Sequence, residues 1–226
     1  MGDMSPKGWI DTMTTTTDFA VADNRAAIRK SGLPTGRIAI LTADRVEDVE
    51  FFYPYYRFTE AGYDVDVLAP GGAEVTGYKG LALRTGVQPI DGARAADYDA
   101  LFIPGGLAPS ELRELPAAID FVSDFAATGR LIGAVCHGPQ VLISAGLVDG
   151  RRMTSWKDVA PEVRAAGAEY VDEPVVEDGQ FITARKPGDM PLELARFLER
   201  LAAEKEQSTQ KADENEKTET EGASHE

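Results

Sequence analysis

Cys136 is the residue with the clearest potential for chemistry, and it is the only cysteine among the 226 residues. It lies in the run Ala134-Val-Cys-His-Gly138, in which a small residue stands two positions away on either side. This spacing is typical of a nucleophile elbow, a tight strand-to-helix turn that exposes its central side chain. A helix beginning at Pro139 would bring free backbone amides near the sulfur and lower its pKa. The sequence therefore predicts a nucleophilic thiolate, against the alternative of a small buried hydrophobic residue.

Three neighbouring positions could assist this thiol. His137 follows it directly and is the only histidine outside the C-terminal tail, so it is a candidate general base or proton shuttle. Gly105 and Gly106 follow an apolar run, and glycine lets backbone amides come close to a developing oxyanion. The amide of His137 is the expected second donor, because the residue after the nucleophile takes this role in an elbow.

A carboxylate partner for the sulfur is expected among the acids after the first apolar run. At least one of them could reach the same edge of the sheet, although for most of them a solvated surface charge is the better interpretation. Composition alone selects none of the four candidates, which are Asp44, Glu47, Asp48 and Glu50.

The elements that must position these residues alternate from Gly36 onward between short apolar runs and amphipathic stretches. This alternation predicts an α/β fold with a mostly parallel sheet covered by helices on both faces. Ligands of such sheets bind beyond the carboxyl ends of the strands, where both glycines and the elbow are expected. Strands are expected at 37–42, 65–68, 98–103 and 130–135, with weaker candidates at 75–78 and 81–85; helices are expected at 49–61, 110–128 with a break at Pro116, and 139–145; segments 163–166, 170–176, 181–184 and 191–203 complete the alternation.

One catalytic domain is expected, over residues 36–203. Residues 1–35 contain few large apolar side chains and are predicted to be a flexible extension, within which Met13 is an alternative start. Residues 204–226 carry eight carboxylates against three lysines and are predicted to be an acidic disordered tail.

The formal net charge of -15 bears on the partners that this chain can bind. An acidic chain argues against nucleic acid as a partner, because such binding depends on clusters of Lys and Arg.

No apolar run is long enough to cross a membrane, and no cluster of Cys and His has metal-site spacing. A single cysteine and the lack of a secretory signal indicate the cytoplasm. An ordinary acidic protein and a protein adapted to a salt-rich cytoplasm both fit this charge.

Three motifs in the same order resemble the ThiJ/PfpI superfamily, in particular its PfpI-type branch of intracellular peptidases and deglycases. They are Glu47-Asp-Val-Glu-Phe51, Ile103-Pro-Gly-Gly106 and Ala134-Val-Cys-His-Gly-Pro-Gln140. The likeness extends from about residue 37 to residue 201. It implies a flavodoxin-like three-layer sandwich related to class I glutamine amidotransferase domains, no cofactor, and a homo-oligomer, either a dimer or a hexamer.

The resemblance also implies roles for individual residues. By position, Cys136 is the nucleophile, Glu47 is the acid that hydrogen-bonds it, and Gly106 with His137 supplies the oxyanion donors. His137 also matches the histidine of a peptidase-like triad. The third triad member implied by the resemblance is a glutamate soon after the glycines, donated across an oligomer interface. Here Ser110 stands at the aligned position, and Glu111 or an acid of a neighbouring subunit is the candidate substitute.

The function expected from these features is that of a cysteine-dependent enzyme acting on carbonyl compounds. Its reaction would be glyoxalase- or deglycase-like, on small aldehydes or glycated proteins, or hydrolytic, on peptides. The alternative is a non-enzymatic redox-sensing or chaperone-like stress protein that uses the same cysteine. Thiol reactivity does not separate these hypotheses, because all of them require a reactive Cys136.

Overall fold

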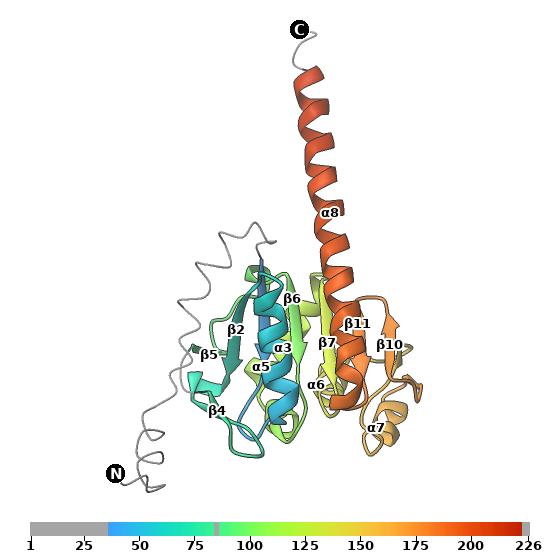
Figure 1. Ribbon diagram of the computed structural model, residues 1–226. Helices are drawn as coiled ribbons and strands as arrows, with labels where there is room; N and C mark the ends of the chain where they lie inside the picture. Colours follow the sequence, from blue (N-terminus) through green and yellow to red (C-terminus); the bar gives the residue numbers. More distant parts are fainter. Residues whose placement is uncertain (1–35, 84–85, 223–226) are drawn as a thin grey trace, which may run out of the picture.

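A seven-stranded sheet forms the centre of the computed structural model, which describes residues 36–83 and 86–222 (Figure 1). The prediction for residues 1–35, including Met13, lies outside the described residues. The strand order is β10-β11-β7-β6-β1-β2-β5, and all neighbours are parallel except β10 and β11. Their bounds are β1 Arg37–Leu41, β2 Asp64–Ala69, β5 Val87–Pro89, β6 Ala100–Ile103, β7 Leu131–Val135, β10 Val175–Asp178 and β11 Phe181–Ala184.

Helices cover both faces of this sheet. In Figure 1, α3 and α8 lie in front of the strands, while α5 and α6 lie behind them. The helices are α3 Asp48–Glu60, α4 Ala108–Leu112, α5 Pro116–Ala127, α6 Pro139–Ser144, α7 Ala160–Ala165 and α8 Met190–Gly222; three short 3-10 turns are η1 Pro70–Gly72, η2 Ala95–Asp97 and η3 Pro187–Asp189. The flavodoxin-like α/β sandwich expected from the sequence is confirmed.

The core explains why the central strands are apolar along their whole length. Every residue of β6 and β7 is buried, because each face of the sheet is covered by helices. On the α3 and α8 side, the rings of Phe58, Phe102 and Phe197 pack with centroids 5.2–6.0 Å apart. Gly133 of β7 lies beneath them, and a Cβ there would come within 2.7 Å of Phe102. This packing fixes the two strands whose ends carry the candidate site.

Short secondary elements lie outside the main sheet. The weaker strand candidates form a small antiparallel pair, and a second pair is parallel. The break predicted at Pro116 separates α4 from α5, with Pro116 in the first turn of α5. The edge strand β5 is absent from the sequence-based prediction, since its three residues include a proline. The bounds of the small strands are β3 Val75–Thr76, β4 Ala82–Leu83, β8 Arg152–Met153 and β9 Glu169–Tyr170.

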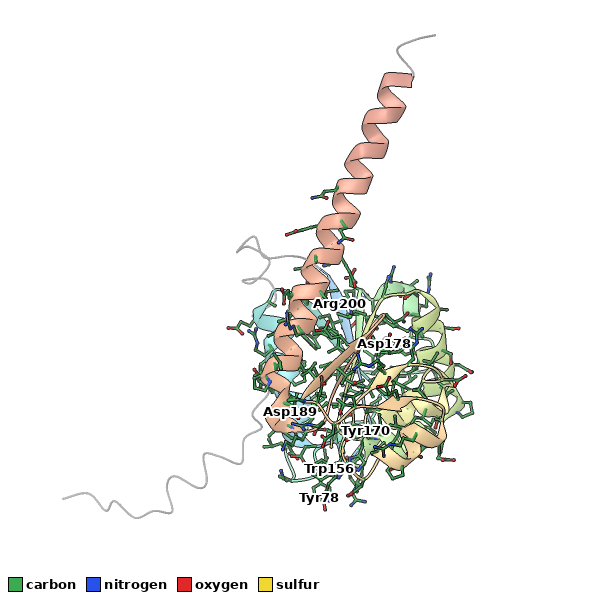
Figure 2. The ribbon with its side chains drawn as sticks, turned by 90° about the vertical axis from the view of Figure 1, so that its right-hand side faces the viewer. Tyr78, Trp156, Tyr170, Asp178, Asp189 and Arg200 are labelled. Carbon is green, nitrogen blue, oxygen red and sulfur yellow. The ribbon has the colours of Figure 1, made fainter. Side chains whose placement is uncertain are left out.

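The C-terminal segment differs from the predicted disordered tail. Helix α8 continues to Gly222 and projects from the body of the molecule (Figures 1 and 2). Leu194, Phe197 and Leu201 anchor its first part in the core. The following residues are rich in Ala, Glu, Lys and Gln, which have high helix propensity, so the helix is continued by local preference. None of the helices among the described residues is both long and apolar enough to cross a membrane.

Candidate active site

Cys136 lies in the turn between β7 and α6. Its φ of 60° is in the left-handed region, which is uncommon for a residue with a side chain. The turn is tight: the Gly138 amide donates to the Val135 carbonyl at 2.7 Å, and the Cys136 amide donates to Ala184 at 2.9 Å. A Cβ at Gly138 would lie 2.3 Å from the Ile103 carbonyl oxygen, so only glycine fits. The turn thus has the geometry of a nucleophile elbow.

Two backbone amides and one imidazole face the sulfur. The amides of Gly106 and His137 hydrogen-bond the Cys136 thiol and favour its ionised form. Nδ1 of His137 lies 3.3 Å from Sγ. The structure therefore brings together the thiol and the two amides that the sequence proposes as oxyanion donors.

The carboxyl group beside the thiol belongs to Glu50, which corrects the expectation of Glu47. Glu50 is completely buried in the first turn of α3, and its side chain hydrogen-bonds Cys136. Glu47 is the N-cap residue, and its Oε1 accepts a hydrogen bond from Lys79 Nζ at 2.6 Å. The physical reason is position on the helix: Glu50 precedes the buried Pro54 and Phe58 by four and eight residues and shares their face.

The two glycines serve different purposes, and this corrects the expectation for Gly105. The Gly105 amide donates to Glu50 Oε2 at 2.8 Å, so it holds the acid and is not available to an oxyanion. A Cβ at Gly105 would lie 2.6 Å from that oxygen and 2.9 Å from the Cys136 Cβ. Gly106 has a φ of +75°, and a Cβ there would lie 2.2 Å from the Glu47 nitrogen. Both positions therefore require glycine.

The protonation of the pair differs from the predicted low-pKa thiolate. Burial, followed by the charge of Glu50, raises the pKa of Cys136 and outweighs the two amides. Burial also raises the pKa of Glu50 to about 7, although the Gly105 amide opposes it. A second negative charge is disfavoured beside the first, so the pair shares one proton around neutral pH. Glu50 is therefore placed to accept the thiol proton and to return it.

His137 lacks the acid partner that a triad would require from Glu111. Glu111 and Ser110 are exposed on α4, and neither lines the cavity above the sulfur. Burial lowers the pKa of His137, so the ring is neutral around pH 7; the charges that oppose this shift come from Asp158 and Glu162. The expectation for Glu111 is therefore not met within this chain, because α4 points its side chain to solvent.

The acids that act on His137 already have partners. Asp158 accepts from Trp156 Nε1 at 3.1 Å. Glu162 accepts from Arg113 at 2.6 Å and from Gln140 at 2.9 Å. Among the described residues, the His137 ring has a hydrogen bond with Cys136 and none with either carboxylate.

A cavity of about 390 Å³ opens above the sulfur. Figure 2 shows Tyr78 and Trp156 at this end of the body, opposite the projecting part of α8. Sequence reasoning missed these wall residues, because they come from loops that meet only in the folded chain. The lining residues are Glu47, Glu50, Tyr78, Lys79, Gly106, Leu107, Cys136, His137, Trp156 and Pro187. The walls are mainly apolar, and the polar groups gather at the sulfur and at the Glu47–Lys79 pair.

No group of three metal-ligating side chains occurs within residues 36–83 and 86–222.

Fold and site together define a class of α/β proteins with a cysteine on a nucleophile elbow. Residues 36–200 match the DJ-1/PfpI family. The chain is 41% identical over 157 residues to protein/nucleic acid deglycase 2 of Escherichia coli. This match covers 69% of this chain and 91% of the relative. It is 37% identical over 155 residues to the putative cysteine protease YraA of Bacillus subtilis, and this match covers 68% of this chain and 91% of the relative.

A solved structure shows the same fold. It is a two-domain protein from Anabaena variabilis with DJ-1/ThiJ/PfpI-like and ferritin-like domains, and it superposes with a TM-score of 0.72 at 38% identity. The match covers 74% of this chain and 48% of that one. This chain belongs to the DJ-1/PfpI family, which confirms the resemblance found in its sequence, and the names of its relatives support enzymatic activity at the level of the family.

Proposed function

We propose that this protein is a cysteine-dependent enzyme that acts on carbonyl groups by glyoxalase- or deglycase-like chemistry. The observation that carries the proposal is the set of partners at the sulfur: the Glu50 carboxyl group and the backbone amides of Gly106 and His137 all act on the Cys136 thiol. This arrangement supplies a nucleophile, a base and oxyanion donors at the bottom of one cavity.

The first step is addition of the thiol to an aldehyde carbon. Glu50 accepts the thiol proton, the sulfur forms a bond to the carbon, and the electron pair of the C=O π bond moves to oxygen. The amides of Gly106 and His137 stabilise the developing oxyanion. Protonation of the oxygen by Glu50 then gives a hemithioacetal, and the carboxylate is regenerated.

With an α-oxoaldehyde, the later steps are proton transfers. The neutral imidazole of His137, 3.3 Å from Sγ, is placed to move a proton between neighbouring carbon and oxygen atoms of the adduct. Water then releases a hydroxy acid and the free thiol. No redox cofactor is needed, because one carbon is oxidised while its neighbour is reduced.

The peptidase hypothesis has less support from this chain. Acyl transfer to a cysteine uses a histidine that a third group orients, and Glu111, exposed on α4, does not supply that group to His137 within one chain. Aldehyde addition requires no complete triad. The name of the Bacillus relative keeps peptide hydrolysis as the second reaction to be measured.

The proposed substrates are small aldehydes and glycated proteins, and the proposed compartment is the cytoplasm. We also propose a homo-oligomer, a dimer or a hexamer. Exposed apolar side chains support this part of the proposal: Val49 and Tyr56 lie on the outer side of α3 with 48% and 44% of their surface accessible, and Leu107 lies at the cavity.

Lactate formation from methylglyoxal, release of the free amine and lactate from a methylglyoxal-glycated amino acid, and hydrolysis of a peptide test this proposal. The wild type should form lactate, Cys136→Ser should form none, and Glu50→Gln should lose most of the rate. Glu47→Gln is the matched control, because it changes a second cavity glutamate that does not contact the sulfur. A folded wild type without either aldehyde activity would favour the sensing or chaperone alternative.

A further inference from the structure

A second carboxyl group lies in the core near the acid of the site. Glu193, in the first turn of α8, is completely buried, and neither of its oxygens has a hydrogen-bond partner among the described residues. Glu50 likewise has one buried oxygen, Oε1, for which these residues supply no partner. A buried polar group without a partner destabilises a fold, so two such groups on packed helices require an explanation.

The charges around Glu193 determine its protonation. Helix α8 packs on β7, β11, α3 and η3, and the two strands contribute no titratable side chain. Glu50 acts on it from α3, and Asp189 acts on it from η3, where Asp189 is itself paired with Arg185. Burial, followed by these two charges, raises the pKa of Glu193 well above its usual range. Glu193 is therefore a neutral carboxylic acid when Glu50 ionises.

We propose that Glu193 is a positioning residue that donates its carboxyl hydrogen toward Oε1 of Glu50 through one water molecule, and so stabilises the carboxylate that accepts the thiol proton. Oε2 of Glu50 already accepts from the Gly105 amide. The Gly105 amide and the Glu193 carboxyl group together offset part of the effect of burial on the Glu50 pKa. The inference rests on the proposed function only in taking Glu50 as the base of the site.

The experiment measures the rate of Cys136 alkylation by iodoacetamide against pH, with no need for turnover. The wild-type rate should rise as Glu50 ionises and becomes able to accept the thiol proton of Cys136. Loss of this rise in Glu50→Gln would assign it to Glu50. Glu193→Gln keeps a neutral donor and should titrate with the wild type. Glu193→Leu keeps the bulk without a donor and should shift the rise upward by about one pH unit, a tenfold lower rate below it.

Glu199→Leu is the matched control, because it removes an exposed glutamate from the same helix and should leave the rise unchanged. An unshifted rise in folded Glu193→Leu overturns the proposal. A downward shift in both Glu193 variants also overturns it, since that result means a charged Glu193. A wild type that turns over no aldehyde, combined with the expected shift of the alkylation rise in Glu193→Leu, would contradict the proposed function and leave this inference standing.

Infrared spectroscopy gives a second measurement in case Glu193→Leu does not fold. At a pH about two units above the rise, Glu50 is ionised, and the carbonyl band of a protonated buried acid should remain in the wild type. The band should disappear in Glu193→Gln. Its absence from the wild type, or its persistence in the variant, overturns the proposal.

Discussion

Asp66 of β2 and Glu50 of α3 are both buried acids, but the protein surrounds them with different partners. Asp66 of β2 is paired with the guanidinium of Arg37 on the neighbouring strand. Glu50, at the carboxyl edge, has no ion-pair partner among the described residues and accepts its hydrogen bond from a backbone amide. An arginine pairs with one acid, whereas burial without a cation raises the pKa of the other to about 7. The comparison distinguishes an acid that stabilises the fold from one that can move a proton.

The largest expected effect is the loss of activity in Glu50→Gln. Removing the proton acceptor should lower kcat/KM for methylglyoxal by about 10²–10⁴-fold, the range typical of general acid–base catalysis. The variant should fold, because the amide removes an uncompensated buried acid. Steady-state kinetics measures the change in kcat/KM, and thermal unfolding of the variant shows whether it is folded. A rate within threefold of the wild type would end the assignment of Glu50 as the base.

The second effect is a pH dependence of stability to which Glu50 contributes. Below pH 4.5 the Glu50 carboxyl is protonated in both the folded and the unfolded protein. From pH 4.5 to about 7 the unfolded chain releases a proton that the folded protein retains, so stability falls as pH rises. The span of 7 minus 4.5 corresponds to a loss of about 3 kcal/mol.

Urea unfolding of the wild type and Glu50→Gln at pH 5 and pH 8 measures this loss. The free energy of unfolding of the wild type should decrease relative to the variant between the two pH values. An equal difference at both would show that burial does not raise the Glu50 pKa.

Asp66→Asn should have a smaller effect, and on stability alone. Breaking a hydrogen-bonded pair with one buried partner should lower the free energy of unfolding by about 2 kcal/mol. The kcat/KM of the remaining folded protein should stay within twofold of the wild type, because the pair is not part of the cavity lining. A large kinetic effect with little destabilisation would break the distinction between the two acids.

Glu47→Gln should have the smallest effect. The Glu47–Lys79 pair is open to solvent on the lysine side, and such exposed pairs contribute little to stability. We expect a change of less than about fivefold in kcat/KM, since a screened pair at the cavity rim is altered while the sulfur keeps its partners. A loss as large as that of Glu50→Gln would restore Glu47 as the acid of the site.

Much of the fold and part of the site could be predicted from local sequence. The apolar runs of β1, β6 and β7 are fully covered strands, so their composition alone identifies them. The elbow is equally local, because its small residues are required within five positions of chain. The edge strand β5 could not be predicted, since three residues with a proline carry no periodic signal.

Which glutamate lies beside the Cys136 sulfur depends on which face of helix α3 packs on the sheet. Both Glu47 and Glu50 precede the apolar positions of α3, and only the packing of this helix on the sheet turns Glu50 to the sulfur and leaves Glu47 at the cap. The four-residue spacing to Pro54 and Phe58 is the signal that could have identified Glu50.

The sequence by itself determined the nucleophile at Cys136, the glycines at the turns and the α/β class, because each depends on residues adjacent in the chain. Tertiary structure alone decided that Gly105 holds the acid, that Glu111 faces solvent, and that Glu193 lies buried within electrostatic reach of Glu50. These outcomes depend on which side chains from distant segments share the core, and the protonation of a carboxyl group depends on that burial and on its neighbours.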